Sequence, residues 1–214
     1  MEIVVIEDHV MVRGFVTRSS RETFPGASVH EASDGAHGLA LCRQLKPDLV
    51  LLDLDLPDAD GLDLAIQIRE AASSTRILVL SSHADPYVVY RLQSAGITSF
   101  VDKNEQSPEM LGTAMRAVVE GRRYVSPLVE RVHLALRTDA KAFSKVLSAR
   151  EIELLRVFGR GLTNDEAATE LKLTAFTVRN HRHNIMAKLG IQSTPALIRY
   201  AIENGFTRIR QKTV

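Results

Sequence analysis

The stretch LVLLDLDLPDADGLDL, residues 49–64, decides the fold of the first half of the chain. It opens with an apolar run typical of a strand buried on both faces, and Asp53 follows that run directly. Open parallel sheets carry their ligand sites at the carboxyl ends of the strands, so Asp53 is the first candidate for chemistry. Asp58, Asp60 and Asp63 come after it, and we interpret them as solvated turn residues.

Four similar runs of apolar, largely β-branched residues occur in this half, at Ile3 to Ile6, Val29 to Ala32, Ile77 to Leu80 and Ser99 to Val101. Segments with helical periodicity separate them. Five strands alternating with helices predict an α/β fold with a doubly wound, five-stranded parallel sheet, because right-handed crossovers place helices on both faces. We expect this domain to span residues 1–120.

Length and composition limit the class of protein. A chain of 214 residues predicts two modest domains, and 45% hydrophobic with 25% charged residues excludes a disordered or fibrous chain. No run approaches the ~18 apolar residues of a membrane span, and the N-terminus enters a strand without a basic leader. We therefore expect a cytoplasmic protein with no membrane partner. Cys42, the single cysteine, excludes an intrachain disulfide and is expected to be a small buried apolar residue.

Charge is divided unevenly along the chain. Residues 1–124 contain 12 Lys and Arg against 18 Asp and Glu, a net charge of −6, whereas residues 125–214 contain 15 against 8, a net charge of +7. An acidic part joined to a basic part is typical of a metal- or phosphate-handling domain coupled to a nucleic-acid reader.

Acidic and basic residues follow three of the predicted strands: Glu7 and Asp8 the first, Asp53 the third and Lys103 the fifth. Carboxylates gathered in one pocket repel each other unless a cation joins them, and oxygen ligands suit Mg²⁺. A carboxylate beside Mg²⁺ and a Lys ammonium can attack a phosphoryl group. The pattern predicts an aspartyl phosphate at Asp53.

The segments IVVIEDH, LVLLDLDLPDADGLDL, ILVLSS and GITSFVDK resemble the flavodoxin-like receiver domain of bacterial two-component response regulators. The resemblance implies that Asp53 is the phosphoacceptor and that a sensor histidine kinase or a small phosphodonor is its partner, with no enzyme activity beyond self-phosphorylation and dephosphorylation. It implies that Mg²⁺ is bound by Asp8, Asp53 and the backbone carbonyl of Asp55, with Glu7 nearby. It also implies that Lys103 contacts the phosphoryl group. The Ser81 hydroxyl and the Phe100 ring are the implied switch residues. Asn104 stands where many receivers have Pro, and Phe100 replaces the commoner Tyr, so that any switching by this ring must work through packing.

An enzyme is the alternative for this half. The sequence LLDLD resembles the nucleophile motif of haloacid-dehalogenase-type phosphatases, with Asp53 as nucleophile and Asp55 as general acid. That motif lies on an early strand, whereas here it lies on the third, and Pro57 occupies the place of its usual Thr or Val. No large insertion is present to form a substrate pocket.

Residues 121–146 form the predicted connection between the domains. Ser126 and Pro127 are an N-cap and first-turn pair, and they open a helix with one apolar stripe that ends near Thr138. From Leu147 onward the pattern is helical, and we expect a small all-α domain over residues 147–209.

A helix-turn-helix is predicted within this second domain. Capping boxes join Ser148 to Glu151 and Thr163 to Glu166, and a helix from Asn164 to Leu171 is followed by a longer one capped by Thr174. On the longer helix Val178, Ile185 and Leu189 form a buried stripe, which leaves another side free to enter a major groove. We assign base contacts to Arg and Asn on that side, and phosphate contacts to Arg182 and Lys188.

The string LSAREIELLRVFGRGLTNDEAATELKLTAFTVRNHRHNIMAKLGI, residues 147–191, resembles the LuxR-type helix-turn-helix of NarL/FixJ-like regulators. The resemblance implies base reading by Arg179, Asn180 and His183, with Thr177 and Lys188 near the phosphate backbone. Double-stranded DNA is then the partner, bound by a homodimer that forms on phosphorylation or on DNA. A protein-interaction module without DNA remains the alternative, since it would also use an amphipathic helix.

Overall fold

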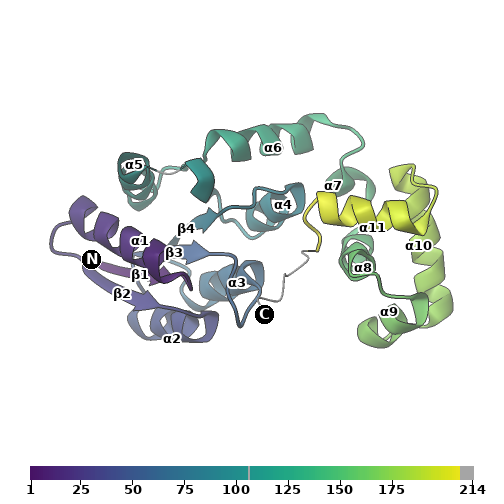
Figure 1. The fold of residues 1–214 in the computed structure, drawn as a ribbon, viewed down its shortest axis with the longest axis horizontal. Helices are drawn as coiled ribbons and strands as arrows, with labels where there is room; N and C mark the ends of the chain where they lie inside the picture. Colours follow the sequence, from purple (N-terminus) through teal and green to yellow (C-terminus); the bar gives the residue numbers. More distant parts are fainter. Residues whose placement is uncertain (106, 208–214) are drawn as a thin grey trace. The chain divides into compact units, whose positions relative to one another are not determined.

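The computed structural model describes residues 1–105 and 107–207 and divides into two compact units. The first comprises Met1–Ala84 with Arg91–Arg131, and the second comprises Asp85–Tyr90 with the residues from Val132 onward. The first unit contains the β-sheet, and the second consists of helices and their connections (Figure 1). The predicted end of the second domain at residue 209 lies outside the described residues.

The sheet has five parallel strands in the order β2-β1-β3-β4-β5. They are β1 (Glu2–Ile6), β2 (Ser28–Ala32), β3 (Leu49–Asp53), β4 (Arg76–Ser81) and β5 (Ser99–Asp102). Each predicted run lies within one of them. This order is that of a flavodoxin-like doubly wound sheet, whose switch point lies between β1 and β3. The predicted fold class is therefore confirmed, and its switch point falls beside Asp53.

Helices connect the strands and lie on both sides of the sheet (Figure 1). In chain order they are α1 (Val10–Thr23), α2 (Gly35–Leu45), α3 (Gly61–Ala71), α4 (Pro86–Ser94), the 3-10 turn η1 (Lys103–Glu105) and α5 (Pro108–Val119). On one face, alternate strand residues pack against α1 and α5 in a single buried cluster: Ile3, Val5, Val16, Leu49, Leu51, Leu78, Leu80, Val101, Leu111, Ala114, Met115 and Val118. Burial of this apolar area is the main stabilising contribution to the unit.

Two glycines allow α2 and α3 to pack closely against β1 and against the chain that leaves β3. A Cβ at Gly38 of α2 would lie 2.5 Å from Ile6 Cδ1, and one at Gly61 of α3 would lie 2.3 Å from the Cα of Leu54. The Gly61 contact holds the start of α3 against the chain that leaves β3. Cys42 on α2 is fully buried, and burial raises the pKa of its thiol to about 12, as expected for a small core residue.

The remaining helices are α6 (Pro127–Thr138), α7 (Phe143–Val146), α8 (Ala149–Gly159), α9 (Asn164–Leu171), α10 (Ala175–Leu189) and α11 (Thr194–Glu203). Both predicted capping boxes are present, at the starts of α8 and α9. Thr174 caps α10 by accepting a hydrogen bond from the Thr177 amide. Val178 and Ile185 are fully buried on one side of α10. These contacts confirm the predicted helix-turn-helix. Among the described helices, none combines the length and apolar character needed to cross a membrane.

Candidate phosphorylation site and nucleic-acid interface

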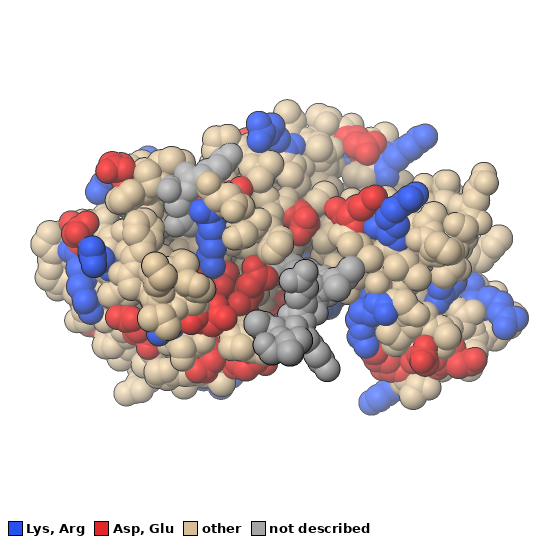
Figure 2. Space-filling model, in the orientation of Figure 1, with Lys and Arg blue, Asp and Glu red and all other residues tan. Residues whose placement is uncertain are grey.

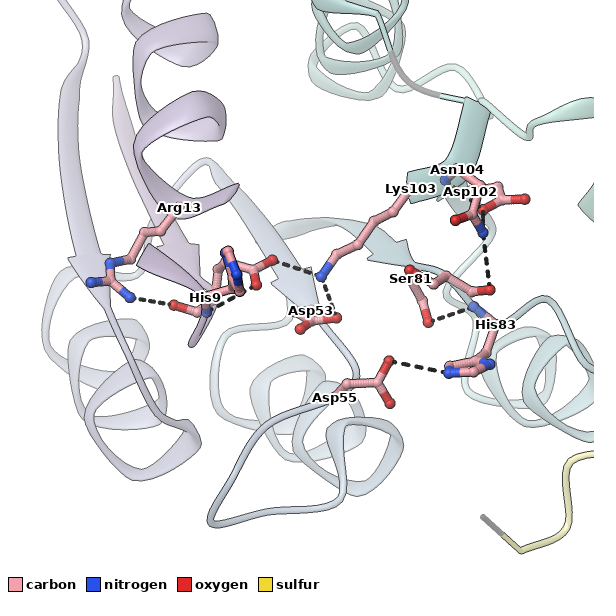
Figure 3. Close-up of polar contacts among 11 residues, drawn as sticks. His9, Arg13, Asp53, Asp55, Ser81, His83, Asp102, Lys103 and Asn104 are labelled. Carbon is pink, nitrogen blue, oxygen red and sulfur yellow. Dashed lines mark hydrogen bonds and ion pairs between the residues drawn. The ribbon is translucent and has the colours of Figure 1, made fainter. Parts of the chain in front are cut away.

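Asp53 ends β3 at the carboxyl edge of the sheet and is 2% exposed. Lys103, just after β5, places its Nζ 2.8 Å from Asp53 Oδ1 and 2.8 Å from Glu7 Oε2 (Figure 3). One ammonium thus lies between two buried carboxylates that come from different strands. Charged groups are tolerated at this depth because they are paired.

The three charges shift one another's pKa. Burial raises the pKa of Glu7 and repulsion from Asp53 adds to the rise, and together they outweigh the hydrogen bond from Lys103. Burial lowers the pKa of Lys103, but attraction to Asp53 and Glu7 exceeds this effect and leaves it above its usual value. Lys103 therefore remains a cation at neutral pH.

The same edge of the sheet gathers carboxylates that could hold a divalent cation. Glu7, Asp8 and Asp53 each place a carboxylate oxygen within 4.8 Å of the others, and Asp8 is exposed, which leaves room for water ligands. A set of hard oxygen donors with open positions fits Mg²⁺. Arg13 fixes the loop after β1, because its Nη1 donates to the carbonyl oxygens of Glu7 at 2.7 Å and Asp8 at 3.1 Å. On the face drawn in Figure 2, acidic side chains gather on the first unit.

The two residues predicted to act as switches are both buried. Ser81 ends β4, and its Oγ accepts a hydrogen bond from the His83 amide at 3.2 Å (Figure 3). Phe100 is 4% exposed and lies on the neighbouring strand β5. Ser81 therefore lies at the same sheet edge as Asp53, whereas the Phe100 ring lies in the interior.

The main chain of Phe100 has partners that sequence patterns did not reveal. Its amide donates to the carbonyl of Tyr124 at 2.9 Å, and its carbonyl accepts from the amide of Ser126 at 3.0 Å. Ser126 is fully buried, and its Oγ accepts from the Asp102 amide at 3.3 Å. Residues 124–126 thus extend the sheet beside β5, although they fall in the predicted connection 121–146.

Another contact that sequence reasoning missed lies beside the phosphoacceptor. His83 Nε2 is 3.8 Å from Asp55 Oδ2, and both side chains are partly exposed (Figure 3). The one sequence signal for the contact between His83 and Asp55 is the position of His83, two residues after Ser81 at the end of β4. The Asp55 side chain is thus directed to His83, and a role for the Asp55 carbonyl as a metal ligand stays a prediction.

The interpretation of Asp58, Asp60 and Asp63 as solvated turn residues holds only in part. Asp58 and Asp60 are exposed in the loop after β3, as predicted, but both also cap helices, and Asp63 lies within α3. Asp58 accepts hydrogen bonds from the amides of Gly35 at 2.8 Å and Ala36 at 2.9 Å and so caps α2 from a distant part of the chain. Asp60 caps α3, with Oδ1 2.9 Å from the Leu62 amide. Asp63 is paired with Arg91 at 2.8 Å. Unsatisfied amides at helix starts and a nearby guanidinium attract these carboxylates.

The exposed side of α10 carries all three predicted base-reading residues, Arg179, Asn180 and His183. Thr177, predicted near the phosphates, is partly buried and its Oγ1 lies 2.8 Å from the hydroxyl of Thr174. Because Val178 and Ile185 anchor the opposite side, the three exposed side chains point away from the domain core. Among the described residues of the second unit, these three side chains form an exposed face of α10.

Lys188 and Arg182, both assigned to phosphates, are engaged within the domain. Lys188 Nζ lies 2.7 Å and 2.9 Å from the two carboxylate oxygens of Glu151, the capping residue of α8. Burial raises the pKa of Glu151, but bonds from Lys188 and Ser148 outweigh it and hold the pKa below its usual value. The phosphate role of Lys188 stays a prediction.

Arg182 has a different environment from the expected one. Its guanidinium carbon lies 3.9 Å from the centroid of the Phe158 ring, and Nη2 donates to the carbonyl of Leu162 at 2.8 Å. Burial lowers the pKa of this guanidinium. The geometry is a cation–π contact that joins α10 to α8, so we correct the assignment of Arg182 from phosphate binding to packing.

Two family descriptions match the chain. The response regulator receiver domain matches residues 3–115, and the bacterial regulatory proteins of the luxR family match residues 145–201. The chain therefore belongs to the two-component response regulators, with a receiver domain followed by a LuxR-type DNA-binding domain. This family regulates transcription, so the phosphatase alternative is set aside.

Individual proteins support the same assignment. Response regulator protein VraR of Staphylococcus aureus is 28% identical over 205 residues, which cover 95% of this chain and 97% of VraR. RcsB of Salmonella enterica serovar Typhimurium, bound to promoter P1flhDC in the presence of phosphomimetic BeF3⁻, is 25% identical with a TM-score of 0.65. That match covers 94% of this chain and 97% of RcsB. A structure of two RcsB dimers bound to two parallel DNAs is 26% identical, with a TM-score of 0.62 and coverage of 94% and 97%.

Proposed function

We propose that phosphorylation of Asp53 by a sensor histidine kinase, with Mg²⁺ held by Asp8, Asp53 and Glu7, controls DNA binding by α10. The observation that carries this proposal is the buried position of Asp53, with Lys103 Nζ 2.8 Å from its Oδ1. A regulator of chromosomal genes would act in the cytoplasm, where both partners are accessible.

The chemistry follows from the residues at the sheet edge. An Asp53 oxygen attacks phosphorus, a P–O bond forms, and the bond to the donor's leaving group, a histidine nitrogen in the kinase, breaks. Lys103 neutralises part of the charge on the transferred phosphoryl oxygens. Mg²⁺, when bound by Asp8, Asp53 and Glu7, would supply further positive charge to neutralise the transferred group. The Ser81 hydroxyl, at the same edge, would donate to a phosphoryl oxygen.

Intact-mass spectrometry tests the site. With Mg²⁺ and acetyl phosphate, the parent protein should gain one phosphoryl group and Asp53→Asn should gain none. Asp63→Asn is the matched control, because Asp63 lies in the same segment but is paired with Arg91 instead of facing Lys103. An adduct of normal mass and yield on Asp53→Asn would place the phosphoacceptor elsewhere.

The DNA-binding form is proposed to be a homodimer. One helix-turn-helix covers only a half-site, so tight binding normally requires two-fold symmetry, and RcsB binds DNA as dimers. Light scattering should show a mass increase after phosphorylation or on addition of DNA. A monomer that persists on DNA at micromolar concentration would contradict the dimer. Gel shifts with a salt titration distinguish DNA binding from the protein-interaction alternative.

A further inference from the structure

The side chain of Phe176 on α10 has no role in the contacts described above. Phe176 lies in the first turn of the helix and is 71% exposed. Among the aromatic side chains of the described residues, Phe176 is the one in the exposed class. It therefore forgoes the burial free energy that the other Phe and Tyr residues gain at least in part.

The position of Phe176 on the helix explains its exposure. It is separated from the buried Val178 by two residues, or about 200° around the helix axis, so the two side chains point in opposite directions. Arg179, Asn180 and His183 follow Phe176 at the spacing that places residues on the same helix face. The ring thus belongs to the surface proposed to meet DNA.

DNA offers one apolar group at the depth that a recognition helix reaches. In the major groove, thymine alone presents a methyl group, on C5, and the side chains that recognise it by apolar contact include Phe. Of the other exposed residues on this face, Arg179, Asn180 and His183 are polar or charged and suit hydrogen bonds to base edges or phosphates, and Ala187 is a small apolar residue eleven positions further along the helix. A ring among them adds a contact that depends on the methyl group.

We propose that Phe176 is a specificity-determining residue that reads a thymine methyl group in each half-site. The inference rests on the proposed DNA-binding function and deepens it. It predicts that the protein distinguishes thymine from uracil at one position per half-site, because deoxyuridine keeps every hydrogen-bonding group of thymidine and lacks only the methyl.

Affinities of the parent and of Phe176 variants for duplexes with and without the thymine methyl group test this proposal. Full-length protein, treated with Mg²⁺ and acetyl phosphate, first selects a duplex from a random library; each thymine of that duplex is then replaced singly by deoxyuridine. At one thymine per half-site, the parent should lose about fourfold in affinity, the value for one buried methyl group. Phe176→Ala should bind both duplexes equally, and Phe176→Leu should retain part of the difference.

Two controls separate the possible outcomes. Leu134→Ala removes another exposed apolar side chain, outside the helix-turn-helix, and should keep the full response to deoxyuridine. Circular dichroism confirms that each variant is folded. If Phe176→Ala weakens binding to the thymine and uracil duplexes equally, the proposal that Phe176 reads the methyl group is overturned. The same holds if the substitution changes only the proportion of dimer measured by light scattering. If the parent selects no sequence at all, the proposed function fails as well.

Discussion

The phosphorylation site and the recognition helix use charged residues in opposite ways. At the carboxyl edge of the sheet, Glu7 and Asp53 are buried and both are already paired with the partly buried Lys103. On α10, Arg179, Asn180 and His183 are exposed. The first arrangement positions reactive groups before a phosphodonor arrives, whereas the second leaves polar groups exposed to a partner. Substitutions should therefore affect chemistry in the first region and affinity in the second.

The largest effect is expected at Lys103. Lys103→Ala leaves two buried carboxylates without their shared cation and removes a positive charge from the transferred phosphoryl group. Phosphorylation by acetyl phosphate should slow by about 100-fold, as for the loss of one preorganised charge donor. A time course of intact mass measures the rate. Arg122→Ala, which removes an exposed cation of the same unit, should match the parent. An unchanged rate for Lys103→Ala would show that its ammonium does not act on the phosphoryl group.

The next effect concerns base reading by α10. Arg179→Ala should remove a contact worth about 1–3 kcal/mol and relax preference at one base pair, and Asn180→Ala should do the same at a neighbouring pair. Affinities on a selected duplex and on scrambled DNA, at several salt concentrations, measure both effects. Equal losses on the two DNAs would show that Arg179 only contacts the backbone.

Lys188 lies on α10, but its charge is paired within the protein, as are the charges of the phosphorylation site. Because its ammonium bonds to Glu151, Lys188→Ala should lower the free energy of unfolding by about 1–2 kcal/mol. Thermal unfolding followed by circular dichroism tests this, with Arg199→Ala as a control, since that residue takes part in an exposed ion pair. If stability is unchanged but the salt slope of DNA binding falls by about one unit, Lys188 contacts phosphate instead.

The smallest effect is a pH dependence from Glu151. Its pKa is lowered on folding, so its contribution is present above the unfolded value of about 4.3 and is lost as the pH falls through the folded pKa. The parent should therefore lose more thermal stability between about pH 6 and pH 3.5 than Glu151→Gln does. Comparing the two proteins cancels contributions from all other carboxylates. If the thermal stabilities of the parent and of Glu151→Gln fall in parallel as the pH is lowered, Glu151 is not the source of this pH dependence.

Local patterns predicted the strands, the capping boxes and the strand-end residues, because each depends on neighbours in the sequence. Apart from the Asp60 cap of α3, which is local, the missed contacts join distant residues. Asp58 caps α2 because the β3–α3 loop passes the start of that helix, and Arg182 lies on Phe158 because α8 and α10 pack together. Residue types alone made an Arg on a basic helix look like a phosphate ligand. Its burial is a property of the packed domain.

Cys42 has a practical consequence for studying this protein. Disulfide exchange and alkylation require a thiolate, and a buried thiol with a pKa of about 12 provides almost none at neutral pH. Because it is the single cysteine of the chain, we expect the parent protein to serve as a background with little thiol reactivity. A cysteine introduced at an exposed position on each unit would then accept a maleimide fluorophore selectively. Energy transfer between such labels would report the separation of receiver and DNA-binding domain before and after phosphorylation.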